Sequence, residues 1–249
     1  MKALITGASS GIGRDMAHIL SQKGYSLVLV ARRIDKLQEL KNSLDTEVEI
    51  IQMDLSDKEN CINLYEKVKN KNIDFLINNA GFGLAGEFIY SDLETEIKMI
   101  DTNIIAVHIL TKLFLKDFVK RDNGIILNVA SSAAYMAGPL MSTYYATKNY
   151  VRRFSQAIYQ ELKEKNSNVK ISVLCPGPVN TEFNNVANVK FAIKGLSSEY
   201  VAKYGIDKAL KGKLSIVPGK AIKIGTFLLR FTPEKFMLKI SHNIQRKKN

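Results

Sequence analysis

A tyrosine, a lysine and a serine stand at spacings that could support proton transfer. Tyr144 and Lys148 lie four residues apart in a predicted helix, so their side chains share one face. A free tyrosine has a pKa of about 10, and a nearby ammonium group lowers that pKa because it stabilises the phenolate. Tyr144 could therefore exchange a proton with a substrate oxygen, while the hydroxyl of Ser131, 13 residues upstream, polarises that oxygen.

Sequence context distinguishes this tyrosine from others with the same spacing. Tyr-x-x-x-Lys also occurs at Tyr65/Lys69, Tyr159/Lys163 and Tyr204/Lys208. Only Tyr144 has a serine 13 residues before it, and Ser131 follows the predicted strand Gly124–Val129, at the carboxyl edge where α/β sheets bind ligands. The neighbouring Ser132 and Tyr145 do not fit both spacings, and we expect Tyr145 to pack against the next helix.

A glycine-rich turn near the N-terminus has the spacing of a phosphate-binding loop. Glycines at positions 7 and 11 permit backbone shapes that side chains forbid, and Gly13 lets the following helix pack close to the sheet. The helix N-terminus offers free N–H groups and a partial positive charge to a pyrophosphate. The alternative is a turn without a ligand. The residues expected to contact a dinucleotide here are Thr6, Gly7, Ser9, Ser10, Gly11, Ile12 and Gly13.

The end of the second predicted strand bears on the choice of dinucleotide. An acidic residue at this place binds the 2′-hydroxyl of the adenosine ribose, but here the strand ends in Arg32 and Arg33. Guanidinium groups suit bidentate binding of a phosphate. The pattern predicts NADP(H) as cofactor, with both arginines near its 2′-phosphate. The alternative is that both are solvated surface charges.

The elements that must position these residues alternate between strands and helices. Short, almost continuous apolar runs are typical of parallel strands buried on both faces, and they occur at Lys2–Thr6, Ser26–Ala31, Val48–Met53, Ile73–Asn78, Gly124–Val129, Val169–Cys175 and Leu214–Val217. Helical patterns lie between them at Ile12–Lys23, Ile34–Leu44, Lys58–Lys69, Leu93–Val119 and Thr143–Lys163. We predict an α/β fold: one domain over residues 1–249, built on a doubly wound parallel sheet of Rossmann type, with about seven strands and helices on both faces.

Together with the glycine turn, four further motifs resemble the short-chain dehydrogenase/reductase family, in the same order along residues 1 to about 181. They are Met53-Asp54-Leu55, Asn78-Asn79-Ala80-Gly81, the Ser131/Tyr144/Lys148 set and Cys175-Pro176-Gly177-Pro178-Val179-Asn180-Thr181. The subgroup that the chain resembles is a bacterial one of uncharacterised NADPH-dependent oxidoreductases. The resemblance implies an enzyme that interconverts a carbonyl (ketone or aldehyde) and an alcohol by hydride transfer, with Tyr144 as the acid–base.

The resemblance also implies which further residues bind the cofactor. Asp54 and the backbone of Leu55 contact the adenine, and Lys148 reaches the nicotinamide ribose beside Tyr144. The remaining cofactor residues that it implies are Asn79, Ala80, Gly81, Pro176, Gly177, Val179 and Thr181. An alternative role for Asp54 or Ser56 is to cap the following helix.

A fourth catalytic residue is implied at Asn103, inside the long helix predicted at Leu93–Val119. In the family an asparagine here kinks the helix and anchors a water molecule of the proton relay. Asparagine has a poor helix propensity, which favours a specific role. The alternative is a solvent-facing side chain.

Charge is concentrated at the C-terminal end. The net charge is +12, and residues 203–249 hold 12 Lys and Arg against 2 Asp and Glu. Apolar Phe236, Ile240 and Ile244 recur at helical spacing among these basic residues. The pattern favours a docked helix or a dimer contact with a solvated basic face, and peripheral contact with an anionic membrane is the alternative. We expect this basic extension, 219–249, to serve assembly or surface attachment rather than chemistry. Few aromatic residues are available for base stacking, so no nucleic acid is expected.

The remaining expectations concern substrate and setting. Residues 182–212 are expected to form a substrate loop or lid, and their apolar side chains could cover a medium-sized apolar ligand. Within the predicted enzyme class, a hydroxysteroid dehydrogenase or a 3-oxoacyl reductase is the alternative; outside it, a non-catalytic NADPH-binding sensor or scaffold. We expect a homo-oligomer (dimer or tetramer). Two cysteines without metal-ligand spacing, and no apparent leader or membrane span, predict a cytoplasmic protein without a metal.

Overall fold

A parallel sheet forms the centre of the molecule. The computed structural model describes residues 1–183, 187 and 195–246. Its seven-stranded sheet has the order β3-β2-β1-β4-β5-β6-β9, and every neighbouring pair is parallel. The strands are β1 (Lys2–Thr6), β2 (Ser26–Ala31), β3 (Val48–Gln52), β4 (Phe75–Asn78), β5 (Ile125–Val129), β6 (Lys170–Leu174) and β9 (Ser215–Ile216). The prediction of a doubly wound sheet of about seven strands is confirmed.

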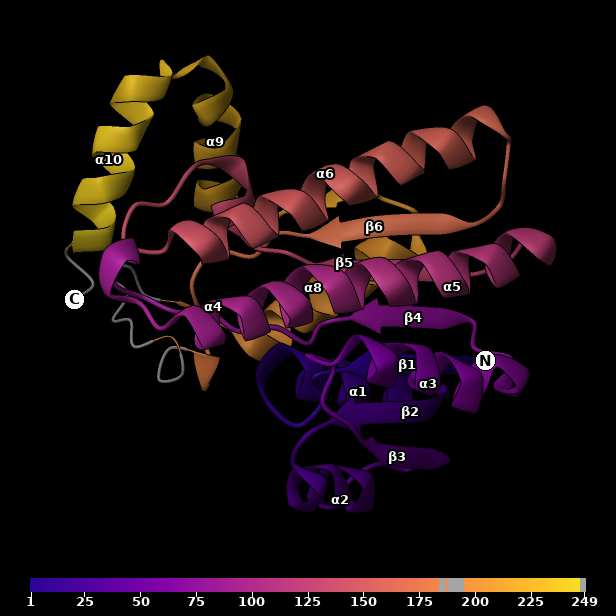
Figure 1. The fold of residues 1–249 in the computed structure, drawn as a ribbon. Helices are drawn as coiled ribbons and strands as arrows, with labels where there is room; N and C mark the ends of the chain where they lie inside the picture. The colour runs from indigo at the N-terminus through magenta and orange to yellow at the C-terminus, as the bar shows by residue number, and fades with distance from the viewer. Residues whose placement is uncertain (184–186, 188–194, 247–249) are drawn as a thin grey trace.

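Helices cover both faces of the sheet (Figure 1). One face packs against α1 (Gly11–Gln22), α2 (Ile34–Asn42) and α8 (Ser198–Leu210). The other packs against α3 (Lys58–Val68), α5 (Ala106–Lys120) and α6 (Ser142–Glu164). Because both sides of the central strands are buried, their sequences are almost continuously apolar rather than alternating. The edge strand β3 is only partly buried and contains Glu49 and Gln52.

Two predicted segments differ from the structure. The helix predicted at Leu93–Val119 is divided into α4 (Leu93–Ile100), a π-helical turn (Asp101–Ile105) and α5. The expected substrate loop 182–212 is too long, because its part 198–210 is helix α8, whose Val201 and Ile206 are fully buried in the core. Residues 184–186 and 188–194 of that loop, and 247–249 of the tail, lie outside the described residues.

Smaller elements gather at the end of the sheet towards which β6 points. There, β7 (Val179–Asn180) pairs with β8 (Leu196–Ser197) in a separate two-stranded sheet. At the same end, α9 (Lys220–Leu228), a 3-10 turn (Leu229–Phe231) and α10 (Glu234–Arg246) form a hairpin that projects from the body (Figure 1). No helix within the described ranges has the length and apolar character needed to span a bilayer.

Candidate active site

The carboxyl ends of the central strands open into a cavity of about 520 Å³. This is the place where α/β sheets bind ligands. Among the site residues expected from the sequence, Thr6, Gly13 and Asn103 lie behind its wall. All the others line it: Gly7, Ser9, Ser10, Gly11, Ile12, Arg32, Arg33, Asp54, Leu55, Asn79, Ala80, Gly81, Ser131, Tyr144, Lys148, Pro176, Gly177, Val179 and Thr181.

The glycine turn has a shape that only glycines permit. Gly7 and Gly11 have φ of +64° and +54°, in the left-handed region that favours glycine. A Cβ at Gly13 would lie 2.4 Å from both the Gly7 oxygen and Asn79 Nδ2. Asn79 Nδ2 itself donates to the Thr6 and Gly7 oxygens (3.1 and 3.0 Å), which ties the turn to the end of β4.

The N-terminus of α1 is open to an anion. Its N-cap residue, Ser10, makes no side-chain capping bond, and the first turn holds no acidic residue. The free N–H groups and the helix dipole therefore face the cavity, as a pyrophosphate requires. Thr181 closes over this turn, because a Cβ at Gly11 would lie 3.0 Å from its Cγ2. The residues present thus fit a dinucleotide phosphate.

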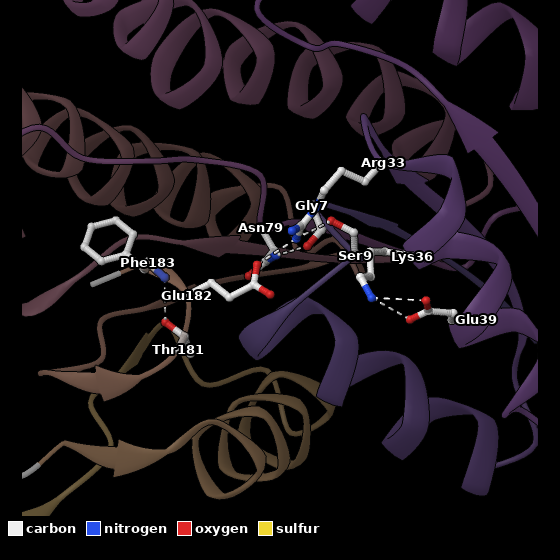
Figure 2. A network of polar contacts seen from close by, with 9 residues as sticks. All are labelled: Gly7, Ser9, Arg33, Lys36, Glu39, Asn79, Thr181, Glu182 and Phe183. Atoms are coloured by element: carbon white, nitrogen blue, oxygen red, sulfur yellow. Dashed lines mark hydrogen bonds and ion pairs between the residues drawn. The ribbon is translucent and has the colours of Figure 1, made fainter. Parts of the chain in front are cut away.

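The two arginines after β2 have different surroundings. Arg33 donates to Ser9 Oγ (3.3 Å) and forms an ion pair with Glu182 (Nη2 to Oε2, 2.8 Å) (Figure 2). The segment after β2 therefore contacts both the glycine turn and the segment after β7. The hydrogen bond from Arg33 lowers the pKa of Glu182 below its ordinary value. Arg32 is exposed, and its backbone oxygen accepts from Gln52 Nε2 at 3.0 Å. Sequence patterns gave no sign of Glu182, since its partner is 149 residues away.

The aspartate at the end of β3 organises its own loop. Asp54 Oδ1 accepts from the backbone N–H and the hydroxyl of Ser56, both at 3.0 Å. The cap of helix α3 is Asp57, which accepts from the Glu59 N–H at 2.8 Å. The helix-cap alternative for Asp54 or Ser56 is therefore wrong, and Asp54 lines the cavity.

Ser131, Tyr144 and Lys148 converge on the cavity from β5 and α6. Tyr144 and Lys148 are buried, and Ser131 is close enough to the Tyr144 hydroxyl to lower the pKa of that group. Lys148 Nζ donates to the Val129 oxygen at 3.1 Å and lies 5.9 Å from the centre of the Tyr144 ring. Gly81 leaves the room for this approach, because a Cβ there would lie 3.2 Å from Lys148 Nζ.

The electrostatics differ from the sequence expectation. Burial raises the pKa of Tyr144 above its ordinary value, and Ser131 offsets only part of that effect. Burial lowers the pKa of Lys148 to about 8. The expected lowering of the Tyr144 pKa relied on the positive charge of a bound nicotinamide as well as on Lys148, and it stays a prediction for the complex. In the protein without cofactor, removal from water outweighs a cation that lies beside the ring.

Asn103 sits in the π-helical turn and is fully buried. Its amide accepts from the Phe82 N–H (3.1 Å) and donates to the Phe82 oxygen (2.9 Å) and to Thr147 Oγ1 (3.0 Å). A π turn changes the direction of a helix side chain and often occurs at functional sites. The expected distortion at Asn103 is present, and the solvent-facing alternative is wrong.

The C-terminal extension reaches the cavity, although its two helices project from the body of the molecule. Gln245 is buried and donates to the hydroxyl of Tyr145, the residue next to Tyr144. Ile222 and Ile244 line the cavity. Tyr145 does pack against a helix, but that helix is α10. Sequence reasoning missed these contacts because they join residues about 100 positions apart.

The cavity beside Tyr144 is apolar. Its wall contains Phe82, Met136, Met141 and Phe183, and the Phe183 ring lies 5.5 Å from that of Tyr144. Apolar lining with a few polar groups is typical of small-molecule sites. Within the described residues, no group of three or more His, Cys, Asp and Glu side chains is placed to hold a metal ion.

Comparison with known proteins identifies the family. Residues 1–191 match the model of the short chain dehydrogenase family. The chain belongs to this family of oxidoreductases. It is 33% identical over 244 residues to the human 17-beta-hydroxysteroid dehydrogenase type 3, covering 90% of this chain and 78% of that protein. An uncharacterized oxidoreductase of Staphylococcus saprophyticus is 36% identical over 186 residues, covering 73% of this chain and 75% of the relative.

Other similar proteins bear names with different substrates and cofactors. The very-long-chain 3-oxoacyl-CoA reductase of Rattus norvegicus is 34% identical over 66% of this chain, which spans 55% of that protein. A Sphingobium yanoikuyae short-chain dehydrogenase in complex with NADPH has a TM-score of 0.84 at 27% identity, covering 92% of each chain. One from Burkholderia phymatum in complex with NAD has a TM-score of 0.83 at 23% identity, covering 91% of this chain and 92% of that one.

Proposed function

We propose that this short-chain dehydrogenase uses NADP(H) to interconvert a ketone or aldehyde and the corresponding alcohol, with Tyr144 as the acid–base. The observation that carries the proposal is the convergence of Ser131, Tyr144 and Lys148 in one cavity beside an open helix N-terminus. When bound, NADP(H) supplies or accepts the hydride. A panel of carbonyl substrates, followed by the absorbance of NADPH, tests the proposal; a non-catalytic sensor or scaffold would bind NADPH without consuming it.

Four residues of this chain have separate roles in the proposed reaction. Ser131 holds and polarises the substrate oxygen, and Tyr144 donates its phenolic proton to that oxygen during reduction. A raised pKa suits this direction, because the phenol is protonated at neutral pH. Lys148 contributes charge and would hold the nicotinamide ribose. Asn103 fixes the Phe82 backbone and Thr147 behind them, which makes it a positioning residue.

The preference for NADP(H) rests on Arg33, whose guanidinium lies at the cavity wall next to Ser9. Replacing Arg33 with alanine should raise the Kd of NADPH by about tenfold or more and change that of NADH little, since a charge-assisted hydrogen bond contributes about 1.5–3 kcal/mol. Titration of both dinucleotides measures this ratio. Arg153→Ala removes an exposed arginine from α6 and serves as the control. Unchanged selectivity in Arg33→Ala would show that the 2′-phosphate binds elsewhere.

Glu182 places a carboxylate where a phosphate would compete for Arg33 (Figure 2). Glu182→Gln should therefore lower the Kd of NADPH by up to about fivefold, the range of an exposed ion pair, and that of NADH less. Glu39→Gln, which removes the partner of Lys36 nearby, is the matched control. Equal effects of Glu182→Gln on both dinucleotides would contradict a competition for Arg33.

A medium-sized apolar carbonyl compound fits the lining beside Tyr144. A steroid ketone and a 3-oxoacyl thioester are the two substrate classes of greatest interest, because relatives at 33% and 34% identity bear the names of enzymes for them. Assembly as a homodimer or homotetramer, and a cytoplasmic location, are further parts of the proposal. Molecular mass in solution tests the first, and cell fractionation the second.

A further inference from the structure

The hairpin of α9, the 3-10 turn and α10 (220–246, the C-terminal hairpin) has an exposed apolar side. Five large side chains on it are between 55% and 73% exposed: Ile224, Phe227, Leu228, Phe231 and Phe236. The first four follow helical spacing, and the rings of Phe227 and Phe231 lie 5.5 Å apart. Single exposed apolar residues are ordinary, but four that share one helix face mark a contact surface.

The same hairpin is strongly basic. Residues 220–246 contain six Lys and Arg and one Glu, and no ion pair among the described residues involves these cations. One of them, Arg230, lies 5.9 Å from the Phe227 ring centre, so charge and apolar surface are adjacent. The basic residues are Lys220, Lys223, Arg230, Lys235, Lys239 and Arg246.

The other side of the hairpin is anchored to the active-site region. Ser241 Oγ donates to the Ala137 oxygen at 2.8 Å, and Gln245 donates to the Tyr145 hydroxyl; both side chains are 2% exposed. Ile222 packs so tightly against Gly177 that a Cβ there would lie 2.8 Å from its Cγ1. The exposed side is therefore held in a fixed position relative to the cavity, whose wall includes Ile222.

We infer that the C-terminal hairpin docks the protein on an anionic lipid surface and that the cavity takes its apolar substrate from that surface. Basic and aromatic residues beside an apolar face are suited to the interface of an anionic bilayer. A second copy of the same surface fits less well, because it would bring like charges together. The inference of membrane docking depends on the hairpin alone, whereas the inference that substrate is taken from the membrane also depends on the proposed carbonyl reduction.

Cosedimentation with vesicles tests the docking. The protein should bind vesicles of equal parts phosphatidylcholine and phosphatidylglycerol, and bind vesicles of phosphatidylcholine alone at least tenfold more weakly, since basic residues near an anionic surface each add to the attraction. Two double variants, Phe227→Ser with Phe231→Ser and Lys223→Glu with Lys239→Glu, should each lose tenfold or more of the binding to anionic vesicles.

Matched changes away from the hairpin provide the controls. Ile62→Ser on α3, and Lys41→Glu with Lys67→Glu on α2 and α3, change exposed residues of the same kinds and should leave vesicle binding unaltered. Equal binding to neutral and anionic vesicles, or equal losses in the controls, would overturn the inference. The inference would also fail if the parent forms a dimer and binds no vesicles, while the Phe227 and Phe231 changes dissociate that dimer. A second copy of the chain would then occupy the surface.

Turnover separates this inference from the proposed function. The hairpin variants should reduce a water-soluble ketone at the parental rate but lose tenfold or more on a long-chain ketone dissolved in anionic vesicles. Equal rates on the vesicle-bound ketone would refute substrate delivery. If the parent reduces no carbonyl compound while its vesicle binding is confirmed, the proposed function fails and the docking stands.

Discussion

Replacing Tyr144 with phenylalanine should lower the turnover of a carbonyl substrate by about 10² or more, the usual size of a general acid–base effect. The substitution removes only the hydroxyl, whose pKa Ser131 influences. The ring should still pack against Phe183 and Tyr145. The fold and the Kd of NADPH should therefore stay close to those of the parent. Steady-state kinetics, with a separate titration of NADPH, measure the two quantities.

The other tyrosines at the same spacing from a lysine are natural controls. Tyr65 donates to Asp117 at 2.6 Å, away from the cavity wall, and its pKa is raised to about 12 by burial and by that hydrogen bond. Tyr159 and Tyr204 likewise are not part of the cavity wall. Phenylalanine at these three positions should leave turnover nearly intact. Near-parental turnover of Tyr144→Phe on a substrate that the parent reduces would refute the assignment.

The sequence was sufficient for the sheet and for most of the cavity because both depend on local patterns. Doubly buried strands are continuous apolar runs, and the residues at their carboxyl ends meet at one edge. The distant Gly7, Arg33, Ser131 and Gly177 therefore share one cavity wall. Their convergence follows from strand order, which the alternation of strands and helices determines.

The features that the sequence did not reveal depend on contacts between distant residues or on solvent access. No local pattern pairs Arg33 with Glu182, or Tyr145 with Gln245. The π-helical turn at Asp101–Ile105 inserts a distortion into a pattern that is otherwise compatible with one long helix. The pKa of Tyr144 rises because its surroundings exclude water, and burial depends on the packed structure as a whole.

Helix α8 illustrates a different limit. Its buried side consists of Val201, Ala202, Ile206 and Ala209, which fit against α1 and the sheet. Gly205 lies on the same side, and a Cβ there would approach Leu174 to 2.9 Å. Small residues permit this close packing, but they weaken the apolar periodicity from which a helix is predicted. The segment therefore resembled a loop.

Replacing Lys148 with methionine should weaken NADPH binding and lower turnover, because this side chain would both hold the ribose and supply charge beside Tyr144. In the parent, burial lowers the pKa of Lys148 to about 8, so its ammonium is lost as the pH rises through that value. The kcat/KM for NADPH should fall above about pH 8, since this parameter reports ionisations of the free enzyme. In Lys148→Met that decline should be absent. An identical decline in the variant would assign the titration to another group.

Lys148→Met should raise the free energy of unfolding, although it lowers turnover. The pKa of Lys148 is about 8 in the native protein and near the ordinary 10.5 in the unfolded chain. Below pH 8 both states hold the proton, and the buried charge costs the native state about 3 kcal/mol. Lys148→Met should therefore raise the free energy of unfolding there by about 2 kcal/mol, after about 1 kcal/mol is lost with the hydrogen bond from Lys148 to the Val129 oxygen.

The pH dependence of the gain in unfolding free energy shows whether the buried charge of Lys148 causes it. Between pH 8 and 10.5 the unfolded parent binds a proton that its native state does not, so this lysine makes the parent more stable as the pH rises. The advantage of Lys148→Met should shrink over the same interval by about 1.4 kcal/mol per pH unit. Urea denaturation of both proteins at a series of pH values measures the difference. A gain that is constant with pH would show that packing, rather than the buried charge, causes it.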